Sequence, residues 1–325
     1  MNRMLRPLAI LAILGGIVPL AAPQAAYALN ARSWVSATGN DPNPCTRTQP
    51  CLTFAGAFVK TAAGGVINCL DSGNFQGVDI SKSITIDCTG VEAGTQVTNP
   101  GGLAFQVDAG PNDVVVLRGL DIQGTGQGSF GIRFFTGGAL HVENCVIRNF
   151  NFTPGWGIDF APETPAELYV SDTVFSSNGS TANGGGILAE LSADGAIAKV
   201  MVNRVQAKGN FFGIKADGSA ASGVINMTVR NSVSSGNSAN GIVGTSNRAA
   251  VVIMIDRSTS SHNIAGFGVI ADGPATVARV GNSSIAGNIN GVGATNGASL
   301  QSYDTNQING NSNDGIASVT PISLH

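Results

Sequence analysis

The sequence predicts an all-β protein, a single right-handed parallel β-helix with three short strands per rung. Three observations lead to this prediction: the composition, a repeat of constant length, and the shortness of every apolar segment. The chain has 325 residues, of which 44 are Gly and only 11% are charged. Gly, Asn and Ser interspersed with Val and Ile are typical of short strands joined by tight turns. A hydrophobic content of 43% excludes an intrinsically disordered chain.

The repeat is marked by a Gly followed by Ile or Val, at intervals of 23 to 29 residues. Two further short apolar segments lie between successive pairs, so one unit of about 25 residues holds three strands. No segment is long enough for the helices of a doubly wound sheet or a TIM barrel. Such a unit closes one rung, and stacking of rungs then builds the core. The pairs are Gly131-Ile132, Gly157-Ile158, Gly186-Ile187, Gly213-Ile214, Gly241-Ile242, Gly268-Val269, Gly291-Val292 and Gly315-Ile316.

An Asn precedes each of the later pairs, as in Gly236-Asn237 before Gly241-Ile242. Rungs stack at the strand spacing of about 4.8 Å, so equivalent Asn side chains lie next to one another. A side-chain amide both donates and accepts hydrogen bonds, and Gly and Asn tolerate the left-handed backbone of a sharp corner. We therefore expect Asn237 and Ile242 to be buried. The predicted ladder comprises Asn149, Asn178, Asn210, Asn237, Asn263, Asn288 and Asn311.

The N-terminus has the pattern of a secretory signal peptide. Arg3 and Arg6 precede an apolar run over 8–20, and Ala26-Tyr27-Ala28 follows as an A-x-A cleavage site. We expect residues 1–28 to be removed and the protein to be exported to the periplasm or the medium, without stable membrane insertion after cleavage. The alternative is an uncleaved anchor, for which the apolar run is short.

The mature chain divides into a cap and a stack. Residues 29–65 are expected to form a strand and an amphipathic helix with Phe54, Ala57, Phe58 and Ala62 on one face, ended by Gly64-Gly65. Residues 66–325 are expected to form the β-helix. The cap covers an otherwise unpaired sheet edge, and no comparable C-terminal cap is visible in the sequence.

Five cysteines are present, and export favours disulfides over metal ligands. We expect Cys45 to pair with Cys51 and Cys69 with Cys88, which leaves Cys145 as a small buried side chain. There is no Cys-x-x-Cys motif and the three His are scattered, so neither a metal site nor a cofactor is expected.

The stretch from Trp34 to Asp41, the segment Cys51-Leu-Thr-Phe54 and the repeat over 66–320 resemble the pectate-lyase-like superfamily of exported parallel β-helix proteins. The resemblance implies the fold and little about activity, because this fold carries lyases, glycoside hydrolases, esterases, epimerases and adhesins. Polygalacturonases of this group have Asn-Thr-Asp, Gly-His-Gly and Arg-x-Lys strings, and its lyases have Trp-x-Asp-His. None of these strings occurs here, so the sequence favours a protein that is not an enzyme.

Stacking the repeats places Arg133, Asp159 and Lys215 in one column, with Glu190 and Asp217 two positions along their strands. Trp156 lies among several Phe residues in the same rungs. We expect Arg133, Trp156, Asp159, Glu190 and Lys215 to be the ligand-binding residues. The alternatives are a solvated face of alternating charge and aromatic rings that belong to the core.

Three functions follow from these patterns. The first is a non-catalytic envelope or extracellular protein that binds or scaffolds, with a polysaccharide as its partner. The second is a polysaccharide-processing enzyme with an atypical site near Asp159. The third is an assembly protein whose end rung stacks on another molecule. A net charge of −3 excludes nucleic-acid binding, and the sequence does not set the oligomeric state.

Overall fold

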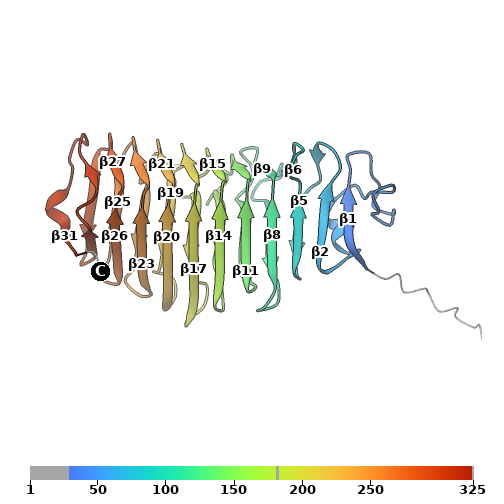
Figure 1. Ribbon diagram of the computed structural model, residues 1–325, viewed down its shortest axis with the longest axis horizontal. Coiled ribbons are helices and arrows are strands. Elements are labelled where there is room, and N and C mark those ends of the chain that lie inside the picture. The colour runs from blue at the N-terminus through green and yellow to red at the C-terminus, as the bar shows by residue number, and fades with distance from the viewer. Residues whose placement is uncertain (1–28, 181–182, 324–325) are drawn as a thin grey trace, which may run out of the picture.

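The computed structural model describes residues 29–180 and 183–323. The chain winds into an elongated parallel β-helix whose rungs follow one another along the long axis, from the blue N-terminal end to the red C-terminal end (Figure 1). The predicted fold class, with three short strands per rung, is confirmed. The expected signal peptide, residues 1–28, lies outside the described residues. None of the helices in the described part is long and apolar enough to cross a membrane.

Three parallel sheets, A, B and C, form the sides of the stack in the described residues. Sheet A contains β1 (Asn30–Val35), β2 (Thr61–Cys69), β5 (Ile84–Asp87), β8 (Val114–Arg118), β11 (Ala139–Glu143), β14 (Ala166–Ser171), β17 (Ala196–Asn203), β20 (Gly223–Arg230), β23 (Ala250–Asp256), β26 (Thr276–Gly281), β29 (Ser299–Ser302) and β31 (Val319–Pro321). Sheet B contains β3 (Gly73–Asn74), β6 (Ala93–Gln96), β9 (Leu120–Gln123), β12 (Val146–Arg148), β15 (Val174–Ser176), β18 (Gln206–Lys208), β21 (Val233–Ser235), β24 (Thr259–Ser261), β27 (Ser284–Ala286) and β30 (Gln307–Ile308). Sheet C contains β4 (Val78–Ile80), β7 (Leu103–Asp108), β10 (Phe130–Thr136), β13 (Trp156–Phe160), β16 (Gly185–Glu190), β19 (Phe212–Asp217), β22 (Ile242–Thr245), β25 (Phe267–Asp272) and β28 (Asn290–Thr295).

The core is built from columns of identical or similar side chains. In sheet C, Ile132 pairs in register with Ile158, which pairs with Ile187 on the next strand. The column continues through Ile214 to Ile242, and every member is buried. Because side chains alternate across a strand, this register directs the intervening residues, Arg133 and Asp159 among them, to the outer face of the sheet.

The corner between sheets B and C holds the ladder of Asn side chains. The Asn237 amide donates to Oδ1 of Asn263 at 2.9 Å, and its own Oδ1 accepts from the Asn210 backbone N–H at 3.0 Å. Asn237 is fully buried, as predicted. The same pattern of bonds joins Asn178, Asn210, Asn237, Asn263, Asn288 and Asn311.

Asn149 is not a member of this ladder. It adopts the left-handed backbone, with φ 59°, which Gly209 and Gly236 adopt in the later rungs. Phe150 therefore occupies the ladder position in its rung, and its backbone N–H donates to Asn178 Oδ1 at 3.1 Å. The predicted ladder was therefore wrong by one residue in this rung. Asn occupies the left-handed corner position here and the ladder position in later rungs, so the residue type alone did not distinguish the two positions.

The first rung is covered by β1 and the short helix α1 (Phe54–Phe58). Thr53 caps the helix by accepting the Gly56 N–H at 2.9 Å, and Phe54, Ala57 and Phe58 are buried. The predicted helix was too long: Ala62 lies in β2, because Thr61 already pairs with Asn30 of β1. The expected boundary between residues 65 and 66 falls inside the same strand.

The last rung also has a cap, which the sequence did not reveal. Asp314 Oδ1 accepts both the Asn311 backbone N–H, at 3.1 Å, and the Asn311 amide, at 2.9 Å. A carboxylate accepts but does not donate when ionised, so Asp314 ends the ladder. A turn of 3₁₀ helix (Ile316–Ser318) and β31 follow and complete this end.

Two disulfides, Cys45–Cys51 and Cys69–Cys88, cross-link the N-terminal part of the chain. The second joins the end of β2 to the residue after β5, two strands that already pair in sheet A. Cys145 is buried at the inner side of a corner, and burial raises the pKa of its thiol to about 12. Such a thiol stays protonated and unreactive at neutral pH.

Candidate functional site

The outer face of sheet C carries the charged column that the sequence predicts. Arg133 pairs in register with Asp159, Asp159 with Leu188, and Leu188 with Lys215. Glu190 and Asp217 are register partners on β16 and β19, two residues further along. We call Arg133, Asp159, Glu190, Lys215 and Asp217 the sheet C cluster.

Arg133 and Asp159 form one half of the cluster. Arg133 Nε donates to Asp159 Oδ2 at 3.0 Å, and the guanidinium lies 4.5 Å from the ring centres of both Phe130 and Phe135. Asp159 is only 2% exposed, and among the described residues its Oδ1 has no hydrogen-bond donor. A buried carboxylate oxygen without a donor costs folding free energy. The position therefore favours protonation of Asp159 or of a neighbouring group that can donate to it.

Lys215 and Asp217 form the other half. The Lys215 ammonium lies 2.8 Å from Asp217 Oδ2 and 5.1 Å from the centre of the Phe212 ring. Ser219 donates to Asp217 from its backbone N–H at 3.0 Å and also from its hydroxyl. Asp217 is therefore held as a carboxylate by three polar groups.

The pKa values of Asp159, Glu190 and Asp217 are shifted in different directions. Burial raises the pKa of Asp159 to about 6, although the charge and hydrogen bond of Arg133 oppose the shift. Burial, with the negative charges of Asp159 and Asp217, raises the pKa of Glu190 to about 7. Burial alone would also raise the pKa of Asp217, but the charge and hydrogen bond of Lys215 outweigh it and lower that pKa. Near neutral pH Glu190 is thus protonated in about half of the molecules, and it faces an ionised Asp217 on the next strand.

Trp156, chosen from the sequence as a surface ring, is not one, because it is 98% buried. Its ring stacks on Phe212 with centroids 6.3 Å apart and planes 9° apart. The two rings belong to strands that are separated by β16, and they can stack because β16 has Gly185 at the intervening position. A Cβ at Gly185 would lie 2.8 Å from the Trp156 ring. Trp156 therefore lies in the same column as Phe130 and Phe212, beside the cluster. Phe130, Phe135 and Phe212 are half-buried.

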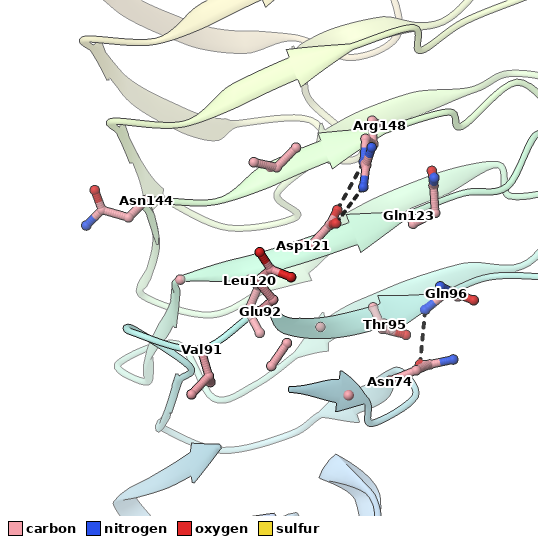
Figure 2. Close-up of a pocket in the computed structure, with 15 residues that line it drawn as sticks. Asn74, Val91, Glu92, Thr95, Gln96, Leu120, Asp121, Gln123, Asn144 and Arg148 are labelled. Atoms are coloured by element: carbon pink, nitrogen blue, oxygen red, sulfur yellow. Dashed lines mark hydrogen bonds and ion pairs between the residues drawn. The ribbon is translucent and has the colours of Figure 1, made fainter. Parts of the chain in front are cut away.

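A second polar region lies on the outer face of sheet B and has no counterpart in the sequence prediction. It is a groove of about 650 Å³, lined by residues of β3, β6, β9 and β12 and of the turns beside them. Figure 2 shows Asp121 and Arg148 joined by two bonds in its wall, with Asn74, Gln96 and Gln123 around it. The available signal was the column of exposed polar residues Gln96, Gln123 and Arg148, which are register partners.

The described residues do not form a recognisable metal site. Within residues 29–180 and 183–323, no group of three His, Cys, Asp or Glu side chains is arranged to hold a metal ion. In the sheet C cluster, Arg133 pairs with Asp159 and Lys215 pairs with Asp217.

The architecture defines the class of protein: a parallel β-helix that carries a cluster of carboxyl groups on the outer face of one sheet. The chain matches no protein-family model, and it matches no curated protein. Two solved structures are similar in fold. One is the crystal structure of pectate lyase Pel9A, with 15% sequence identity, a TM-score of 0.47, and coverage of 86% of this chain and 71% of that chain. The other is the selenomethionine derivative of GH136 lacto-N-biosidase from Eubacterium ramulus, with 12% identity, a TM-score of 0.41, and coverage of 90% and 67%.

Proposed function

We propose that the chain is an exported glycan-processing protein and that the sheet C cluster is its acid–base centre. The observation that carries the proposal is the pair Glu190 and Asp217, which sit on adjacent strands with pKa values shifted in opposite directions. Pairs of carboxyl groups with divergent pKa values are what acid–base cleavage of a glycosidic bond requires. Export is supported by the two disulfides, which fit an oxidising compartment.

In this proposal Glu190 protonates the leaving oxygen, because it is partly exposed and its raised pKa of about 7 keeps about half of it protonated near neutral pH. Asp217, kept ionised by Lys215, faces the positive charge that develops on the sugar ring. Adjacent strands are about 4.8 Å apart, nearer to the roughly 5 Å carboxyl separation of retaining glycosidases than to the wider inverting arrangement. Asp159 acts through Glu190 as a positioning residue, since it is buried and its charge raises the pKa of Glu190.

The half-buried rings of Phe130, Phe135 and Phe212 give the cluster an apolar rim. Sugar rings have apolar faces that pack on aromatic rings, so these side chains are the ones that we expect to contact substrate. Non-catalytic glycan binding, the function favoured by the sequence, would use the same rim. It would leave the divergent pKa values of Glu190 and Asp217 without a role.

The test is hydrolysis of a panel of neutral and acidic polysaccharides, measured as release of new reducing ends. We expect Glu190→Gln and Asp217→Asn each to lower the rate by about 10² to 10⁴, the usual contribution of a general acid or base. Glu167→Gln on sheet A, another partly exposed carboxyl group paired with a lysine, is the control and should leave the rate unchanged. Activity of the wild-type protein should fall as the pH rises through about 7, because Glu190 then loses its proton.

A stability measurement checks the same pKa values without a substrate. A carboxyl group whose pKa is raised by folding stabilises the protein below its unfolded pKa, and that contribution disappears as the pH rises through the folded value. The free energy of unfolding should therefore decrease between about pH 4 and 7 in the wild type, and less so in Glu190→Gln. Absence of hydrolysis across the panel, or equal rates for Glu190→Gln and wild type, would overturn the proposal.

A further inference from the structure

The sheet B groove continues around a corner of the molecule. A second groove of about 560 Å³ lies beside it, lined by residues of β4 and β7 and by the turn that precedes β7. Asn74, Thr95 and Gln96 line both grooves. The two therefore join into one elongated depression, which we call the corner track, running from Asn144 and Arg148 on one side to Asp79 and Asn99 on the other.

The corner track is lined by amides and carboxylates. Its amide side chains are Asn74, Gln76, Gln96, Asn99, Gln123 and Asn144, and its acids are Asp79, Glu92 and Asp121. Within the described residues, the side chains of Gln96, Asn144 and Glu92 make no intramolecular hydrogen bond. These are free donors and acceptors on the surface of a groove, available to a ligand.

The charge of the track excludes polyanions. Arg148 is its one cationic side chain among the described residues, and it is neutralised by Asp121 through bonds of 3.2 Å and 2.6 Å (Figure 2). Binding of a phosphate or uronate polymer needs unpaired Lys or Arg side chains. The remaining acids leave the track negative, which disfavours an anionic ligand, and its many amides favour a ligand rich in groups that exchange hydrogen bonds with them.

The shape favours a polymer over a small molecule. The sheet B part alone crosses four successive strands, β3, β6, β9 and β12, a length of roughly 14 Å at the strand spacing. A groove that passes from one face of the stack to another fits an extended chain. The lining has few large apolar side chains, which an extended peptide would need for its own side chains.

We propose that the corner track is a binding site for an extended neutral polysaccharide, separate from the sheet C cluster. We assign it binding without cleavage, since Asp121 is held in its ion pair with Arg148. The inference does not depend on the proposed function: a protein without hydrolytic activity would still bind through the track.

The test is affinity electrophoresis of the full chain in gels that contain dextran, galactomannan, xyloglucan or β-1,4-galactan, with polygalacturonate and heparin as acidic probes. We expect retardation by at least one neutral polymer and none by the acidic ones. The double variant Gln96→Ala/Gln123→Ala should weaken the retarding interaction about tenfold or more. Gln206→Ala, on the outer face of sheet B but outside the track, should bind as the wild type does.

A charge variant strengthens the test. Glu92→Lys, at an exposed position of the track, should gain affinity for polygalacturonate while the chain stays folded by circular dichroism. Glu190→Gln should keep the retardation, which separates the track from the proposed catalytic centre. The proposal is wrong if no neutral polymer retards the protein, if the double variant binds as tightly as wild type, or if only an extended peptide binds.

Discussion

Asn237 and Asn149 show how the position of a residue within the rung decides its role. Both are Asn at the corner between sheets B and C, yet Asn237 is fully buried with its amide in the ladder, and Asn149 takes up the left-handed backbone one residue earlier. Asn237 accepts from the rung before and donates to the rung after. Because it serves two neighbours, its loss would leave the buried backbone N–H of Asn210 without its acceptor and would remove one donor from Asn263 Oδ1.

We predict that Asn237→Ala lowers the free energy of unfolding by about 3 kcal/mol, because the buried Asn210 N–H loses its acceptor and the side-chain bond to Asn263 is lost. Denaturant unfolding measures this. Asn149→Gly is the control, since Gly accepts the same backbone and only a half-exposed bond to Gln123 is lost. Equal effects of the two substitutions would mean that the ladder contributes no more than an ordinary corner.

The carboxyl groups of the sheet C cluster are a second case at this scale. Asp159 and Asp217 are the same residue type two strands apart, and one has a raised pKa and the other a lowered one. Asp159 is buried with one oxygen unpartnered, whereas Asp217 accepts from Lys215 and Ser219. The surroundings of each side chain, not its chemical type, decide whether the pKa of the carboxyl group is raised or lowered.

At the scale of elements, the N-terminal strands depend on covalent links more than the rest of the stack does. Strands β3 and β4 have two and three residues, and short strands bury little apolar surface. The disulfide between Cys69 and Cys88 ties β2 to β5 beside them. Of the two strands that the disulfide joins, β5 has only four residues, whereas the later sheet A strands β17 and β20 have eight each. The later rungs have no cysteine apart from the buried Cys145.

We predict that Cys69→Ser/Cys88→Ser lowers the free energy of unfolding by about 3 kcal/mol, the loop-entropy value for a short enclosed segment. Thermal and denaturant unfolding of the purified protein measure it. Cys145→Ser is the matched control, because Ser232 and Ser258 already occupy the same buried corner position in later rungs. A control variant as unstable as the double variant would show that burial of sulfur, and not the cross-link, is what matters.

At the scale of the whole molecule, each rung contacts its neighbours, so stability is a sum of local interfaces and the ends are the weakest points. The N-terminal end is covered by α1, and the C-terminal end is closed by Asp314, the 3₁₀ turn and β31. Asp314 also provides the last acceptor in a ladder that runs through six Asn residues.

We predict that Asp314→Ala causes fraying confined to the last rungs, with faster amide hydrogen exchange in β28 and β30 and unchanged exchange in the middle of the stack. Hydrogen exchange followed by mass spectrometry resolves the two regions. Asp314→Asn keeps a side-chain oxygen for the Asn311 N–H groups and should restore protection. Uniform deprotection of all rungs would contradict a stack of independent interfaces.

The sequence by itself determined the repeat, and with it the fold, the inward column of Ile and Val, and the register that brings Arg133, Asp159, Lys215, Glu190 and Asp217 to one face. This works because stacked rungs turn a constant interval along the chain into a spatial neighbour. Tertiary structure alone decided the burial of Trp156 and Asp159, the pKa values of the carboxyl groups, the corner track and the C-terminal cap. Each of these depends on what loops and side chains from other rungs place around a residue, and that environment does not repeat.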